Sequence, residues 1–148
     1  MVKKLKELSN IDIDKMCARI PGYGGCMSKD ELPKKLDGKF YVINLEDSDK
    51  GHGTHWVEVD DRNKNYVCYI DSEGEVPPKS VRSAMRKSGK KMKIHHFMLQ
   101  PLGSSSCGWY CVAAAKEMMG KEDGMENFLS HFDLNDTKDN DKILAKMF

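Results

Sequence analysis

The sequence has no apolar run long enough to cross a membrane. Its N-terminus, MVKKLKELSN, carries lysines but lacks the apolar segment of a secretory signal. The five cysteines are odd in number and include no C-x-x-C pair, whereas disulfide scaffolds use cysteines more densely and in even numbers. We therefore expect no membrane partner, no disulfide framework and an intracellular, reducing location.

The sequence also lacks an excess of positive or negative charge, because the net charge is +1 over 148 residues. This balance neither favours nor excludes a polyanionic partner. Charged residues make up 32% of the chain and hydrophobic residues 39%, which is typical of a globular domain. With no repeat, low-complexity tract or domain boundary in sight, we expect a single domain over residues 1–148, and a monomer.

The pattern of apolar residues predicts an α+β fold. Helical spacing or helix-start signals occur at residues 9–21, 77–91, 107–120, 124–132 and 141–148. β-Branched and aromatic residues predict strands at residues 39–45, 54–59, 66–71 and 93–100, with a long surface loop at 22–39. We expect a small, mostly antiparallel sheet packed on a central helix that starts at Cys107, with the other helices flanking it.

Two of these strands form a predicted hairpin. The segment THWVEV alternates, with His55, Val57 and Val59 on one face, and the turn signal DDRNKN separates it from the returning strand YVCYID. An antiparallel pairing across this turn places His55 and Asp71 near the same end of the sheet.

Cys107 begins a predicted helix and follows the loop GSSS. A helix N-terminus favours the thiolate, which is the nucleophilic form of cysteine. Small residues before the cysteine keep the approach to the sulfur open and let backbone amides contact a ligand. A single cysteine on a helix is usually a core residue, so the prediction depends on partners elsewhere in the chain.

Three such partners are present. His55 is a candidate general base, and Asp71 can face it across the hairpin and orient its ring. Glu73 is a rival for that role, although it falls in the expected turn. Gln100 lies seven positions before Cys107, where its amide can stabilise an oxyanion.

The order His–Trp, Asp, Gln, Cys–Gly in GTHWVEV…CYIDSEG…QPLGSSSCGWYC resembles the adenovirus-protease family of cysteine proteases. It is similar, more distantly, to the SUMO-specific proteases of the same clan. The resemblance implies a papain-like topology with Cys107 as nucleophile, His55 as base and acid, Asp71 as its orienter and Gln100 as oxyanion donor. We also expect a substrate-binding role for three neighbours of these residues: Trp56, Ser106 and Gly108.

The resemblance further implies an endopeptidase that cleaves capsid or core precursor proteins next to glycine or another small residue, in the virion or the infected cell. Members of this family can be activated by a peptide tethered to a cysteine that lies between the acidic residue and the glutamine. Residues 72–106 contain no cysteine, which argues against that form of activation here. We expect no cofactor, with a peptide or DNA activator left open.

Other functions also stay open. The same four residues suit a deubiquitinase or desumoylase. A non-catalytic nucleic-acid-binding module would instead use the basic residues of the segment 79–93, which could follow a phosphate backbone or simply be solvated: Arg82, Arg86, Lys87, Lys90 and Lys91. We expect no metal site, because His52 and His55 are three apart and would face opposite sides of a strand.

Overall fold

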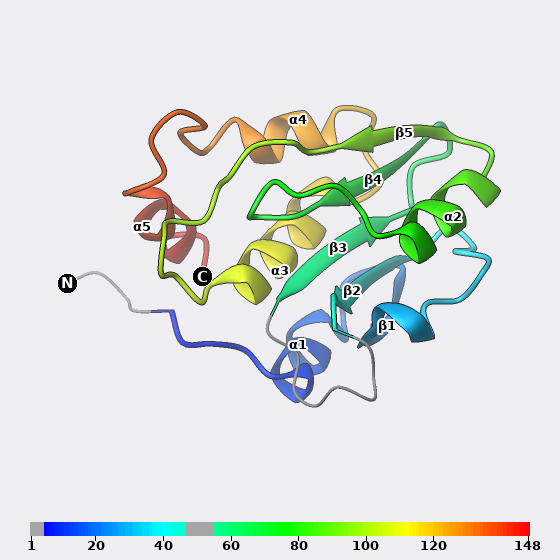
Figure 1. The fold of residues 1–148 in the computed structure, drawn as a ribbon, viewed down its shortest axis with the longest axis horizontal. Coiled ribbons are helices and arrows are strands. Elements are labelled where there is room, and N and C mark those ends of the chain that lie inside the picture. The colour runs from blue at the N-terminus through cyan, green and yellow to red at the C-terminus, as the bar shows by residue number, and fades with distance from the viewer. Residues whose placement is uncertain (1–4, 47–54) are drawn as a thin grey trace.

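The computed structural model describes residues 5–46 and 55–148, and five strands lie side by side at its centre (Figure 1). They are neighbours in chain order: β1 (Tyr23–Ser28), β2 (Phe40–Asn44), β3 (Trp56–Asp60), β4 (Tyr66–Ile70) and β5 (Lys91–Ile94). The inner pairs are antiparallel, whereas β1–β2 and β4–β5 are parallel. The sheet is therefore mixed rather than mostly antiparallel, since helix α2 carries the chain back between β4 and β5.

The helices are α1 (Asn10–Cys17), α2 (Lys79–Lys87), α3 (Cys107–Met118), α4 (Gly124–Leu129) and α5 (Asn140–Ala145), with a 3₁₀ turn, η1 (Lys29–Glu31). The expected α+β class is confirmed. Ser9 caps α1, and its hydroxyl accepts from the backbone of Asp12 in a reciprocal capping box. Within the described ranges, no helix is both long and apolar enough to span a membrane.

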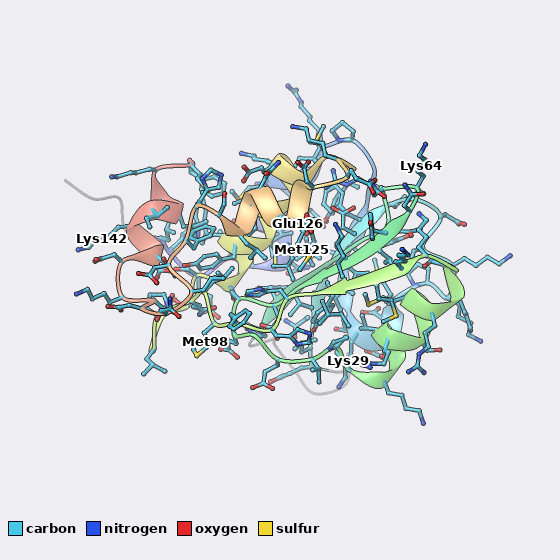
Figure 2. The ribbon with its side chains drawn as sticks, turned by 90° about the horizontal axis from the view of Figure 1, so that it is seen from above. Lys29, Lys64, Met98, Met125, Glu126 and Lys142 are labelled. Carbon is cyan, nitrogen blue, oxygen red and sulfur yellow. The ribbon has the colours of Figure 1, made fainter. Side chains whose placement is uncertain are left out.

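Each face of the sheet has its own apolar core. The larger one lies around α3 and includes Trp56, while the smaller one includes Val57, Val59 and Met85 of α2. The predicted alternation along β3 is therefore confirmed. Figure 2 shows the side chains from above, with Lys142 of α5 at one end of the molecule and Lys64, between β3 and β4, at the other.

Helix α3 is buried on every side rather than along one stripe, since all residues from 107 to 115 are buried. The sheet covers it on one side, and α1, α4 and α5 also contact it. The helix ends where Met119 and Gly120 adopt positive φ values of 46° and 70°.

Two predictions about strands were incomplete. The segment 22–39 contains β1, which alternation could not reveal because all six of its residues are half-buried. Gly24 is required there, since a Cβ would lie 2.3 Å from the Tyr41 ring. The strand expected over 93–100 is β5, which starts earlier and ends at Ile94. Beyond it the chain leaves the sheet toward α3 (Figure 1).

Candidate active site

The site forms where β3 begins, β4 ends and α3 starts. Glu58 pairs with Ile70 across the antiparallel strands, so His55 just before β3 comes beside Asp71 just after β4. His55 Nε2 lies 2.5 Å from Asp71 Oδ1, and the two side chains are 12% and 0% exposed. The predicted hairpin thus brings these two residues together.

Cys107 is the first residue of α3 and is 4% exposed. The backbone N–H of Trp56 donates to its Sγ at 3.4 Å. The sulfur of Cys107 also acts on the His55 ring, and since Nε2 faces Asp71, Nδ1 is the ring nitrogen left for the sulfur. The ring therefore lies between the thiol and the carboxylate, as a triad requires.

The electrostatics of the site favour a protonated imidazole. Burial by itself lowers the pKa of His55, but the hydrogen bond to Asp71 and the influence of Cys107 outweigh it and raise this pKa to about 10. The protonated ring and the N-terminus of α3 both lie at the Cys107 sulfur. The arrangement suits nucleophilic attack followed by proton donation from the ring.

The four other cysteines are in a different environment. Burial raises the pKa of Cys17, Cys26 and Cys68 to about 12, and it raises that of Cys111 as well. These thiols stay protonated near neutral pH and act as small core residues. All five cysteines are free of disulfides.

Gln100 is buried, and its amide is held at both ends. Ser72 Oγ donates to Gln100 Oε1 at 2.7 Å, and Gln100 Nε2 donates to the carbonyl of Ser104. The Ser72 carbonyl also accepts from the backbone N–H groups of Leu99 and Gln100. An amide nitrogen carries two hydrogens, so the contact with Ser104 leaves one for a substrate oxyanion.

Ser72 is a positioning residue that the sequence analysis missed. It directly follows Asp71, so the end of β4 fixes the histidine through one residue and Gln100 through the next. The available signal was a polar residue two positions after the end of a buried strand. Its partner is 28 positions away, which no local pattern indicates.

Glu73 is close to the site without replacing Asp71. Its carboxylate lies 3.8 Å from His55 Nε2 and is 49% exposed. Its backbone N–H donates to Asp71 Oδ1 at 2.8 Å, which helps to fix that carboxylate. Within the described residues Asp71 Oδ2 has no hydrogen-bond partner, so Asp71 acts through Oδ1.

These three residues also form a group whose potential ligand atoms lie within 4.8 Å of one another. Two ligands of a tetrahedral zinc ion are roughly 3.3 Å apart. The 2.5 Å between His55 Nε2 and Asp71 Oδ1 is instead a hydrogen-bond distance. The group fits a catalytic pair with a neighbouring carboxylate better than a metal centre.

The three expected substrate-binding residues are all buried. Trp56 is 7% exposed, and its indole N–H donates to the Leu8 carbonyl at 3.1 Å. Gly108 packs against the same residue, since a Cβ there would lie 3.1 Å from Leu8 Cβ. Ser106 is 3% exposed and immediately precedes the nucleophile. Their contact with substrate stays a prediction.

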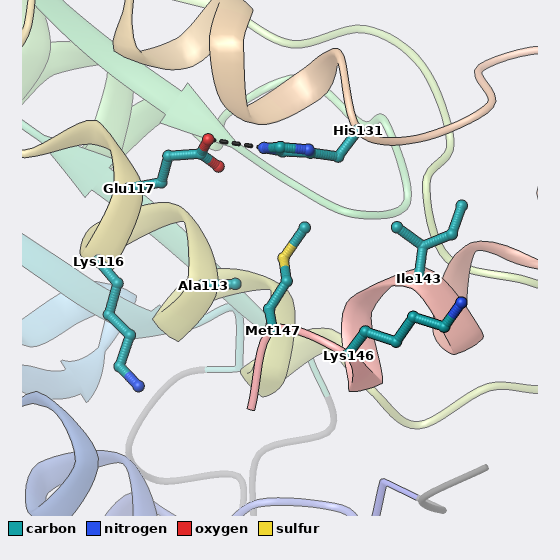
Figure 3. Close-up of a pocket in the computed structure, with 7 residues that line it drawn as sticks. All are labelled: Ala113, Lys116, Glu117, His131, Ile143, Lys146 and Met147. Carbon is teal, nitrogen blue, oxygen red and sulfur yellow. Dashed lines mark hydrogen bonds and ion pairs between the residues drawn. The ribbon is translucent and has the colours of Figure 1, made fainter. Parts of the chain in front are cut away.

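The predicted nucleic-acid-binding residues lie on α2, on β5 and, in the case of Lys90, between them, away from the start of α3 (Figure 1). Arg86, Lys87 and Lys91 are exposed and Arg82 is half-buried, whereas Lys90 is paired with Asp61 at 2.8 Å. A separate pocket of about 440 Å³ lies between α3 and α5 and contains the ion pair of His131 with Glu117 at 2.6 Å (Figure 3). It includes none of the triad residues.

Comparisons with known proteins agree with this architecture. No family model and no curated protein matches the chain. Among solved structures, the crystal structure of ASFV pS273R protease matches with a TM-score of 0.64 and 16% identity, over 95% of this chain and 66% of that chain. The chain has the fold of this protease. A crystal structure of the Se-Met protease matches with a TM-score of 0.50 and 18% identity, over 97% of this chain and 53% of that chain.

The similarity confirms the predicted fold, including the likeness to a viral protease. Both are structures of the same protease, and this chain spans 66% of one of them and 53% of the other. At such low identity the comparison concerns the fold. Any function must therefore be argued from the geometry of the site.

Proposed function

We propose that the protein is a viral cysteine endopeptidase with Cys107 as nucleophile. The observation that carries this proposal is the alignment of Cys107, His55 and Asp71 at the start of α3. The buried amide of Gln100, which contacts the loop that leads to Cys107, adds an oxyanion donor. The fold of a viral protease supports the same reading.

In the first step, the Cys107 thiolate attacks the carbonyl carbon of the scissile bond, and the π electron pair of the C=O bond moves to the oxygen. The remaining Nε2 hydrogen of Gln100 and the backbone N–H of Cys107, at the start of α3, bind that oxyanion. His55 then gives its Nδ1 proton to the leaving amine. The C–N bond breaks, the amine departs, and the acyl group stays on Cys107 as a thioester. Neutral His55 next takes a proton from water, and the resulting hydroxide attacks the thioester carbonyl. The C–S bond breaks, which releases the carboxylic acid and restores the thiolate.

The burial of the site supports a substrate with small residues at the cleaved bond. Cys107 is 4% exposed and the His55 side chain 12%, so little space is open above the reacting atoms. A glycine next to the scissile bond meets this limit better than a branched residue. We propose capsid or core precursor proteins as substrates, with Trp56, Ser106 and Gly108 at the edge of the bound peptide.

The test is cleavage of quenched-fluorescent peptides that sample residue pairs around a glycine. The wild type should cleave a subset that contains glycine or alanine at the bond. Cys107→Ala and His55→Ala should reduce cleavage by more than about 10³-fold. Cys26→Ala is the matched control, because it removes a half-buried thiol on β1 and should leave the rate unchanged.

Cleavage that persists in Cys107→Ala would refute the proposal. A ubiquitin-like vinyl sulfone probe separates the related alternative, since a deconjugating enzyme would be labelled at Cys107 and the proposed endopeptidase would not. Salt-sensitive DNA binding with no cleavage would favour the nucleic-acid-binding module instead.

A further inference from the structure

The loop between Gln100 and Cys107 must hold the oxyanion donor at a fixed position relative to the nucleophile, yet it has no helix or strand of its own. Gly103 adopts a positive φ of 78°, and Leu102 is 89% exposed. Inside the loop, one backbone bond joins Ser104 N–H to the Pro101 carbonyl. The contacts that fix this loop therefore come from elsewhere.

They come from the first turn of α5, which lies beside the loop and the start of α3 (Figure 1). Asp141 Oδ2 accepts from Ser104 Oγ at 2.7 Å and from Ser106 Oγ at 3.0 Å. Asp141 Oδ1 accepts from Tyr110 Oη at 2.9 Å. One carboxylate thus joins the loop to the first turn of the catalytic helix.

The neighbouring residue holds the other end of the loop. Asn140 is fully buried, and its Nδ2 donates to the carbonyl of Leu99 at 2.9 Å. The same amide is fixed by Asp133, whose carbonyl accepts from Nδ2 and whose N–H donates to Oδ1. Asn140 therefore binds the chain just before Gln100, and Asp141 binds the loop that follows it.

A chain of contacts runs from α5 to the oxyanion donor. Asp141 fixes the Ser104 hydroxyl, which also accepts from the Ser106 N–H at 3.2 Å. The Ser104 carbonyl in turn accepts from Gln100 Nε2. A carboxylate whose only task was to stabilise the N-terminus of α5 would not need three hydroxyl donors from another part of the chain.

We propose that Asp141 is a positioning residue of the oxyanion hole, acting on Gln100 through Ser104. This inference rests on the proposed hydrolase function. Its physical content is that Asp141 lowers the barrier only of reactions that place negative charge on a carbonyl oxygen. Reactivity of the sulfur itself, set by His55 and Asp71, should not depend on it.

Two reactions of the same thiol separate these effects. Methyl methanethiosulfonate is attacked at sulfur and releases methanesulfinate, so no oxyanion forms on a carbonyl. Benzyloxycarbonyl-glycine 4-nitrophenyl ester is attacked at its carbonyl carbon and releases 4-nitrophenolate through a tetrahedral oxyanion. Rates for the Cys107→Ala protein, subtracted in each case, isolate the reaction at Cys107.

Asp141→Asn should slow ester acylation by at least roughly tenfold. The loss should stay smaller than the loss of about 10²–10³-fold expected when an oxyanion donor is removed altogether. Its thiosulfonate rate should stay within about twofold at every pH. Asp139→Asn is the matched control, because it removes a charge from the residue before the same helix. Asp139 is exposed and pairs with Lys142 at 3.4 Å, and its loss should change neither rate.

Equal losses in both reactions, or no loss in either, would overturn the inference. If Asp141→Asn does not fold, Ser104→Ala removes the loop side of the contact while α5 stays intact, and the same selective loss is expected. An unselective effect of Ser104→Ala would then overturn it. Wild-type acylation no faster than that of Cys107→Ala would refute the hydrolase itself, and this inference with it.

Discussion

Ser72→Ala tests whether the end of β4 orients the oxyanion donor. The Ser72 hydroxyl donates to Gln100 Oε1 at 2.7 Å, with the two residues 2% and 4% exposed. Alanine removes this donor and leaves a buried amide oxygen unsatisfied, which costs about 1–3 kcal/mol. The bonds from the Ser72 carbonyl to Leu99 and Gln100 belong to the backbone and remain.

The expected kinetic effect lies below that of losing Gln100 itself. Removal of an oxyanion donor costs about 10²–10³ in kcat, or about 2.7–4 kcal/mol. In Ser72→Ala the amide keeps its contact with the Ser104 carbonyl but can turn about it. We therefore expect a loss of roughly 10–30-fold in kcat with KM nearly unchanged, since the contact matters mainly in the transition state.

The assay is a double-mutant cycle on the best-cleaved glycine peptide. Because Ser72 acts through Gln100, the double variant Ser72→Ala/Gln100→Ala should be no slower than Gln100→Ala alone. Ser83→Ala, exposed on α2, is the control for loss of a hydroxyl. Additive losses in the double variant would refute the reasoning, because they would mean that Ser72 acts independently of Gln100.

Three further predictions concern charge. In Asp71→Asn the His55 ring loses the carboxylate that contributes most to its raised pKa, so the alkaline limit of activity should move from about pH 10 toward 6.5, and an unmoved limit would contradict the assignment. Burial raises the pKa of Glu58, so its contribution to stability is present below pH 4.5 and is lost as pH rises. The gain in free energy of unfolding from Glu58→Gln, followed through Tm, should therefore grow with pH by at most about 1.4 kcal/mol per pH unit, and a constant difference would exclude this cause. If DNA binds the exposed face of α2, Arg86→Ala/Lys87→Ala should lower the salt dependence of binding by about two ions, whereas equal slopes would exclude this face.

The sequence alone determined most of the elements and the identity of the reacting groups. Alternation placed Val57 and Val59 on one face of β3, and the turn after it implied that His55 and Asp71 meet. The small residues before Cys107 marked the start of α3. These features are local or span one hairpin, so side-chain periodicity and turn chemistry are enough to predict them.

Tertiary structure decided what joins distant segments. Strand β1 became visible only through its pairing with β2, because its half-buried residues carry no alternation. The contact of Ser72 with Gln100 links positions 28 residues apart, and that of Asp141 with Ser104 links positions 37 residues apart. Serine and aspartate are common in turns and at helix ends, so their sequence context does not distinguish a cap from a positioning residue. Only the folded chain shows which oxygen each hydroxyl reaches.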